Sequence, residues 1–484
     1  MSKDNTPTSP SAGNGSSPAG GSGGTAASCC PNDFTLSPCR IVKAGGTLQI
    51  SATELDGYGA GTYEWTTSSG KVTLENANSS TVTVRAGANA SASRGAESIR
   101  VTRTAPGCSP ISKTADVTVA KIKFSEAASP NNRYGYDNFD TPADSTDDHI
   151  CIKKSDHTFV HVEIEGGAIG TDFDWVCDPA APCTPVAPGG DAAFDLRLDA
   201  GAQDKVETTL HAKSKCPGAE SFGSIKVHVY KEKVVEVVVA KIDKTDAGTN
   251  MRFPNADYAA HAPTANAKLK EAVVKYDITN FDAANKPTAV NLASGTSTVS
   301  YDIGAAGGAD LTAIGAAMTG TGTKKRVAIV RDLKSYYYLS AEAKAGDPTI
   351  TVTAGHVFST STTLQLGTGA AREGVTFASI SGSTITLGAP LANDHPAGAP
   401  VEYGAAGWAT DPILIKEGSS SEDVIKWTIL HEVGHTRLTL TDINDATNFM
   451  HYNQSWTDYR LRYCPRTIYR GGGTENQWET IPRT

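Results

Sequence analysis

The chain has 484 residues, enough for roughly two to four domains of ordinary size. Its 43 basic and 52 acidic residues give a net charge of -9, which argues against a nucleic-acid-binding protein, because such proteins normally present a basic face. No stretch approaches about 18 consecutive apolar residues, so we expect no membrane span, and the N-terminus lacks the apolar core of a secretory signal peptide.

The N-terminal part of the sequence predicts a tail followed by a β-sandwich. Residues 1–28 consist mostly of Ser, Gly, Pro, Ala, Thr and Asn, and we expect them to form a disordered tail. Residues 29–121 carry short alternating segments separated by turn residues. The strands are expected at residues 46–52, 61–67, 71–74, 80–84, 97–101 and 115–119. Trp65 and the segment "SSGKVTLEN" that follows its strand resemble bacterial immunoglobulin-like modules, which implies that Trp65 packs in the core.

Residues 122–236 repeat this pattern, and we interpret them as a second immunoglobulin-like sandwich. Strands are expected at residues 157–164, 172–177 and 224–230, with His161 and His228 on the strand surface rather than as metal ligands. The cysteines fall into an early and a middle group of four, which suggests disulfide pairing within each module; free thiols are the alternative, and the connectivity cannot be deduced. The groups are Cys29, Cys30, Cys39 and Cys108, then Cys151, Cys177, Cys183 and Cys216, with Cys464 alone.

Residues 237–484 mix strand and helix signals and predict an α+β domain. We expect a buried strand at residues 237–240, a helix at 263–276 and a further strand at 326–330. Residues 347–403 consist only of short strands and tight turns, and they resemble small β-modules of phage tail and fibre proteins. We interpret them as an insertion, so Lys344 and Gly404 should lie close together.

The chemistry is carried by the segment His431-Glu432-Val433-Gly434-His435, which is expected late in an amphipathic helix that begins at Ser421. Residues four apart share one face of a helix, so both imidazoles can bind one zinc ion. Glu432 is then the general base for a water on the metal. This pattern predicts a zinc metallopeptidase, that is, a metal-binding hydrolase.

The helix and the segment after it resemble the metzincin peptidases, whose pattern is H-E-x-x-H-x-x-G-x-x-H/D followed by a Met-turn. The resemblance covers roughly residues 421–455 and implies that Met450 packs beneath the zinc ligands. Leu438 and Thr441 depart from the pattern, because they stand where Gly and the third ligand should be. Asp442, one residue late, is the favoured third ligand.

Two assignments stay open. A distant glutamate could replace Asp442 as third ligand, as in gluzincins, and Glu479 and Glu475 are the candidates. Asn448-Phe449-Met450-His451-Tyr452 is similar to the astacin Met-turn, which implies either that Tyr452 stabilises the oxyanion or that it packs behind the turn.

The whole chain resembles effector toxins of contractile injection or type VI secretion systems. This resemblance implies a zinc endopeptidase made in the bacterial cytoplasm, secreted without a signal peptide and acting outside the producing cell. It further implies a protein substrate and, as partners, components of the injection apparatus. The alternative is a structural or adhesive surface protein with a degenerate zinc site, which Leu438 and Thr441 favour.

Overall fold

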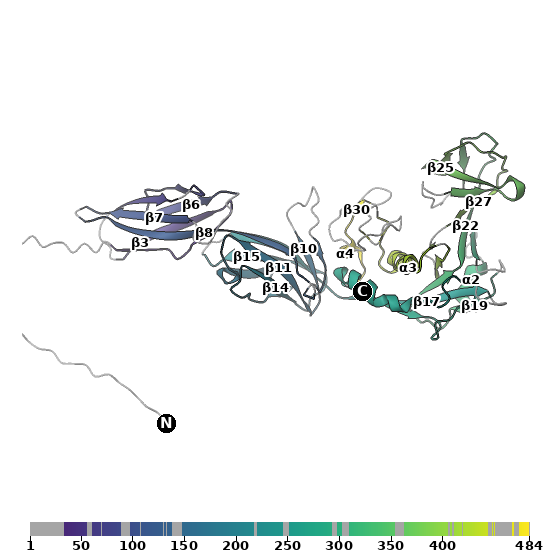
Figure 1. The fold of residues 1–484 in the computed structure, drawn as a ribbon, viewed down its shortest axis with the longest axis horizontal. Helices are drawn as coiled ribbons and strands as arrows, with labels where there is room; N and C mark the ends of the chain where they lie inside the picture. The colour runs from purple at the N-terminus through teal and green to yellow at the C-terminus, as the bar shows by residue number, and fades with distance from the viewer. Residues whose placement is uncertain are drawn as a thin grey trace, which may run out of the picture. The chain divides into compact units, whose positions relative to one another are not determined.

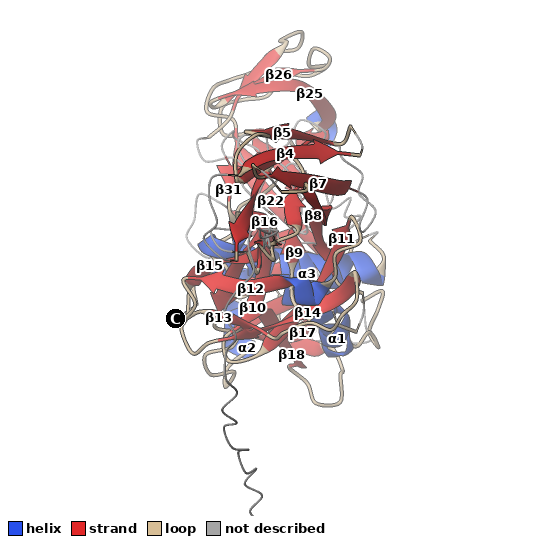
Figure 2. Ribbon diagram, turned by 90° about the vertical axis from the view of Figure 1, so that its left-hand side faces the viewer, coloured by secondary structure: helices blue, strands red, loops and turns tan. Residues whose placement is uncertain are grey.

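Strands dominate the structure and helices are few (Figure 2). The chain divides into two compact units, unit 1 with residues up to 88 and 97–117, and unit 2 with residues 89–96 and 118–484. The computed structural model describes residues 33–55, 61–68, 70–88, 97–106, 108–128, 130–131, 133–137, 148–216, 220–244, 251–292, 298–302, 309–353, 363–404, 407–408, 411–418, 420–443, 448, 450, 467–468 and 474–483. The expected tail, residues 1–28, lies outside this description.

Unit 1 is a β-sandwich, as expected from the alternating pattern. One sheet has the order β1-β3-β6-β5; the other contains β4, β7 and β8, with β2 on β8. The bounds are β1 Phe34–Leu36, β2 Ile41–Lys43, β3 Thr47–Glu54, β4 Thr62–Thr67, β5 Val72–Glu75, β6 Thr81–Ala86, β7 Glu97–Thr104 and β8 Ile111–Glu126. Trp65 is buried and its Nε1 donates to the Ser79 carbonyl at 2.7 Å, so it packs in the core as expected.

Unit 2 begins with a second sandwich. Its sheets are β12-β15-β16-β10-β9, and β13-β14-β11 with the second half of β8. The bounds are β9 Tyr136–Asp137, β10 His149–Lys153, β11 His157–Glu165, β12 Phe173–Asp178, β13 Cys183–Pro185, β14 Ala193–Ala200, β15 Val206–Ser214 and β16 Ser221–Tyr230, with a 3-10 turn η1 at Gly170–Asp172. His161 is half-exposed beside Asp195, but the surface position expected for His228 is wrong, because it is buried against His149.

The cysteines do not pair as two sets of four. Cys39, Cys108 and Cys216 are disulfide-bonded, whereas Cys151, Cys177 and Cys183 are buried free thiols. Cys216 is therefore bonded to a cysteine outside the middle group, and the expected pairing within that group is wrong. Cys29, Cys30 and Cys464 lie outside the described residues.

The C-terminal part of unit 2 is built on the sheet β18-β17-β21-β29-β28, with β19 on β17. Figure 1 labels β17 and β19 of this sheet. Strands β17, β18, β21 and β29 run parallel and β28 pairs antiparallel with β29, so this part of the chain combines helices with a mixed sheet. The bounds are β17 Lys233–Lys244, η2 Ala259–His261, α1 Ala262–Leu269, η3 Lys270–Ala272, β18 Val274–Asn280, β19 Thr288–Val290, β20 Thr298–Asp302, α2 Ala309–Ala317, β21 Lys325–Val330, β28 Gly407–Trp408, β29 Ile413–Lys416, α3 Glu422–Arg437, β30 Thr467–Ile468, β31 Thr474–Glu475 and α4 Gln477–Thr480.

Both faces of this sheet are covered, which explains the unbroken apolar run in β17. Val237 and Val239 belong to one core with α1 and α3, while Val238 and Ala240 belong to a second core that includes Ile314 of α2. The helix expected at residues 263–276 is half wrong: α1 ends at Leu269, because Val273 has φ +55° and the chain then enters β18.

The β-rich insertion is present, but it begins earlier than expected. Strand β22 pairs antiparallel with β27, placing Lys334 opposite Gly404 and Tyr338 opposite Pro400. Gly404 is thus paired with Lys334 and not, as expected, close to Lys344. The insertion has a buried core of its own that includes Tyr337, Leu364 and Val401. Its elements are β22 Asp332–Tyr338, β23 Thr349–Thr351, β24 Thr363–Leu366, η4 Gly369–Ala371, β25 Glu373–Ser381, β26 Thr384–Leu387 and β27 Pro400–Gly404.

Within the described residues, none of the helices combines the length and the apolar character needed to span a bilayer.

Candidate metal centre

Helix α3 forms where the sequence indicated and begins at a well-made cap. Ser421 has extended backbone angles, and its side chain accepts a hydrogen bond from the Val424 amide at 3.3 Å. Glu422 and Asp423 occupy the first turn, where carboxylates suit the helix dipole, and both form ion pairs with Lys426. The helix therefore has local reasons to start here before any packing is considered.

The second half of α3 is buried against the sheet. The helix contacts β29, β21 and β28, and Ile425, Ile429 and Val433 fill the core on that face. His431 and Glu432 are 5% and 9% exposed, so neither is an ordinary surface side chain. Burial of two adjacent polar side chains costs free energy unless each forms hydrogen bonds or binds an ion.

The turn that follows α3 is displaced by one residue from the turn of the metzincin pattern. Leu438 keeps helical backbone angles, and Thr439 takes the left-handed conformation with φ +57°. A residue of this conformation just after a helix is usually glycine. The left-handed position falls one residue later than the glycine of the pattern, and Asp442 is likewise one residue later than the expected third ligand.

This turn also orients His435. Its Nδ1 lies 2.8 Å from the Leu440 carbonyl, which can only accept, so Nδ1 carries the proton and Nε2 is left as the ligand atom. Sequence reasoning did not identify Leu440, because a backbone carbonyl has no sequence signal.

The structure brings together His431, His435 and Asp442. The two Nε2 atoms are 3.2 Å apart, and Asp442 Oδ1 lies 3.3 Å from that of His431 and 3.4 Å from that of His435. Zinc bonds of about 2.0–2.1 Å in tetrahedral geometry place neighbouring ligand atoms about 3.3–3.4 Å apart. The three donor atoms therefore form a triangle of the size that one tetrahedral zinc ion requires, and their chemistry suits that ion.

The charges of the cluster depend on one another. Burial alone lowers the pKa of His435, but hydrogen bonding to Asp442 and the charge of Glu432 raise it to about 9. Burial raises the pKa of Asp442, yet its bonds to both imidazoles hold it well below the usual range. Burial raises the pKa of Glu432, against the opposing effect of the two histidines. A metal ion at the centre would replace the imidazole protons as the positive charge that stabilises the Asp442 carboxylate.

Glu479, the alternative third ligand, is directed elsewhere. It accepts a short hydrogen bond from the Tyr230 hydroxyl, and its carboxylate lies 3.7 Å from Lys205. Glu479 thus joins α4 to the second sandwich. Glu475 lies in β31, and its side chain is outside the described residues.

Met450 is fully buried in the core that contains Val433 and Ile443. The Ile443 amide donates to its carbonyl at 2.9 Å, and Asn448 exchanges two side-chain hydrogen bonds with Gln477. The sequence did not single out this amide pair, which anchors the turn to α4. Tyr452 lies outside the described residues.

No protein-family model and no curated protein matches the chain. Among solved structures, the fibronectin(III)-like modules of Clostridium thermocellum CbhA align with 41% of this chain and 95% of theirs, at 15% identity and a TM-score of 0.21. The tandem Ig repeats of Dlar align with 41% of this chain and 98% of theirs, at 10% identity and a TM-score of 0.16. At such scores neither match carries an argument, and the description of the chain as mostly β-sandwich is based on its strand pairing.

Proposed function

We propose that the chain is a zinc-dependent endopeptidase with His431, His435 and Asp442 as metal ligands. The observation that carries the proposal is the triangle of donor atoms, with sides of 3.2–3.4 Å, on a buried helix end. Two surface histidines on an ordinary helix would have no reason to converge on a carboxylate at this spacing. Asp442 is preferred over Glu479, which is engaged by Tyr230 and Lys205.

Zinc bound here would supply a Lewis acid and an activated water. Glu432 adjoins the first ligand in sequence, and burial raises its pKa toward the range in which a carboxylate both accepts and returns a proton. It would take the proton of the attacking water and pass it to the leaving amine. His435 is held in the ligand tautomer by the Leu440 carbonyl, so its geometry is set before the metal arrives.

The biological setting is a further part of the proposal. Sandwich modules followed by a peptidase domain with a β-insertion favour an effector toxin that is delivered by an injection apparatus and acts on a protein outside the producing cell. A structural or adhesive protein with a degenerate site is the second candidate. Leu438 and Thr441, which differ from the metzincin pattern, favour this second candidate. The turn at Thr439 is shifted by one residue, so the difference at these two positions is weaker evidence for it.

Zinc content and peptide hydrolysis, measured on matched variants, test the assignment. We expect one zinc per chain in the wild type and none in the His431→Ala/His435→Ala double variant. Glu432→Gln should keep zinc and lose activity toward a casein-like substrate by about 10²–10⁴-fold, because it removes only the base. Asp442→Ala should lose zinc affinity and activity together.

Glu479→Ala is the control for Asp442→Ala, because it removes a carboxylate of unit 2 that lies outside the triangle. It should keep both zinc and activity. Loss of zinc in Glu479→Ala with retention in Asp442→Ala would refute the ligand assignment. Full hydrolysis by Glu432→Gln would refute the mechanism, and a zinc-bound but inactive wild type would favour the degenerate site.

A further inference from the structure

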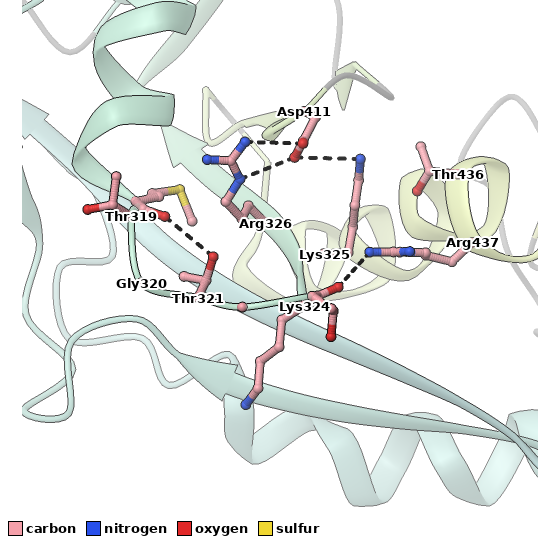
Figure 3. Close-up of a pocket in the computed structure, with 12 residues that line it drawn as sticks. Thr319, Gly320, Thr321, Lys324, Lys325, Arg326, Asp411, Thr436 and Arg437 are labelled. Carbon is pink, nitrogen blue, oxygen red and sulfur yellow. Dashed lines mark hydrogen bonds and ion pairs between the residues drawn. The ribbon is translucent and has the colours of Figure 1, made fainter.

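A second polar site lies at the start of β21, beside the last turn of α3, in a cavity of about 680 Å³ (Figure 3). This volume is in the range of sites for small molecules. Its walls come from the turn between α2 and β21, the start of β21, Asp411 and the last turn of α3. None of the proposed zinc ligands lines it.

The charge of this cavity is strongly one-sided. Lys324, Lys325, Arg326 and Arg437 line it, and Asp411 is the only acidic residue among its lining residues. The Lys324 ammonium donates to the Thr279 hydroxyl at 3.4 Å and points away from the other cations (Figure 3), so the remaining four groups give the cavity a net charge of +2. Arg326 lies 3.1 Å and Lys325 3.8 Å from Asp411, so one carboxylate is shared by two cations. Burial and the nearby Arg437 and Arg326 lower the pKa of Lys325, against the opposing effect of Asp411.

The cations are held in place by backbone groups. Arg437 Nη2 donates to the Thr323 carbonyl at 2.8 Å, and this is its one hydrogen bond among the residues that the structure describes. Arg326 Nη1 donates to the Gly315 carbonyl at 3.0 Å. A guanidinium has five N–H donors, so each arginine is oriented by the protein and keeps donors for a ligand. Sites that are oriented in advance bind anions at a lower entropic cost.

The turn itself offers neutral donors. Thr319, Thr321 and Thr323 alternate with Gly320 and Gly322, and all five residues line the cavity. The Thr321 hydroxyl donates to the Met318 carbonyl at 3.4 Å, which leaves Thr319 and Thr323 as the candidate hydroxyl donors. Both glycines have positive φ, at +79° and +62°, and a Cβ at either would meet nothing within 4 Å, so the backbone faces open space here. Hydroxyl and amide donors beside fixed cations are the groups that bind phosphate oxygens.

We propose that this cavity is a binding site for a dianionic oxyanion, in particular a phosphate group. A net charge of +2 is matched better by the charge of about -1.5 to -2 on a phosphate monoester than by a single carboxylate. Donors from three segments converge on the space, which suits a tetrahedral group. The inference is independent of the proposed zinc site.

Calorimetric titration of the full chain tests the site, with inorganic phosphate, ribose 5-phosphate and acetate compared at equal ionic strength. We expect one saturable site for each of the two phosphates and none for acetate. Binding should be equal with and without one equivalent of zinc. Saturable binding of acetate, no saturable binding of phosphate, or phosphate binding that requires zinc would overturn the proposal.

Variants of opposite expected effect locate the site. Arg437→Gln should weaken phosphate binding roughly tenfold or more, since it removes a charged hydrogen-bond donor. Asp411→Asn should tighten it several-fold, because it removes the competing carboxylate while keeping the shape. Arg372→Gln, an exposed arginine of the β-insertion paired with Glu402, is the control and should change nothing. Weaker binding in Asp411→Asn, or equal loss in Arg372→Gln and Arg437→Gln, would place the anion elsewhere.

Discussion

At the scale of single residues, Thr439 accounts for the one-residue offset between this chain and the metzincin pattern. Its left-handed backbone places the turn after α3 one residue later than the pattern, and Asp442 moves with it into contact with His431 and His435. The histidine pair could be anticipated from sequence because its spacing reflects helix geometry, and Asp442 could be anticipated only from the resemblance to the metzincin pattern. The shift could not, because a left-handed threonine looks like any other threonine.

Glycine substitutions at Thr439 and Leu438 test this account. Thr439→Gly should stay within about 1 kcal/mol of the wild-type stability and keep zinc. Glycine adopts φ +57° without strain, and this gain offsets the loss of the Thr439 side-chain hydrogen bonds. Leu438→Gly should cost about 3–5 kcal/mol, because it empties a fully buried position. Chemical denaturation of both variants measures the difference, and the reverse order of stabilities would contradict the shifted turn.

At the scale of elements, the sequence predicted strands correctly where apolar and polar residues alternate without interruption. Strands β3, β4 and β7 fall where alternation indicated them, because each has one buried and one open face. The helix expected at residues 263–276 was over-extended because Ala272, Val273 and Tyr276 also fit a helical period. Their burial instead belongs to the transition into β18.

The hairpin that carries the β-insertion leads to a prediction about its independence. Replacing residues 339–399 by Asn-Gly should join β22 to β27 through a tight turn at the Tyr338–Pro400 pair. We expect zinc stoichiometry and the helical circular dichroism signal to persist, since the insertion has its own core. Loss of zinc in a folded deletion variant would show that the insertion supports the metal centre.

At the scale of the whole molecule, the modular order could be predicted but the grouping could not. Composition and turn spacing separate the sandwiches from the C-terminal domain. Contacts between distant segments then join the second sandwich to that domain within unit 2: Cys151 and Tyr230 share a core with α3, and Arg483 donates to the Lys231 carbonyl. Such long-range packing leaves no periodic trace in the sequence.

Two truncations test this grouping. A chain that begins at residue 118 should fold and bind zinc as the full chain does, because unit 1 ends at Val117. A chain that begins at residue 237 should be strongly destabilised, because it loses β17's first residues and the side chains of Cys151 and Tyr230 from the shared core. Thermal unfolding and zinc content distinguish the two, and equal stability of the shorter chain would show that the C-terminal part of unit 2 folds independently of the second sandwich.

The position of Trp478 has a consequence for biosynthesis. Trp478 and Ile481 fill the same core as Leu430 and Val433 of α3, although they are translated well after that helix. Until residues 474–483 have left the ribosome, the hydrophobic side of α3 has no complete cover, and the nascent chain exposes apolar surface of the kind that chaperones bind. Closure of the core, and with it a fixed arrangement of His431, His435 and Asp442, should therefore be a late event that follows synthesis of this segment.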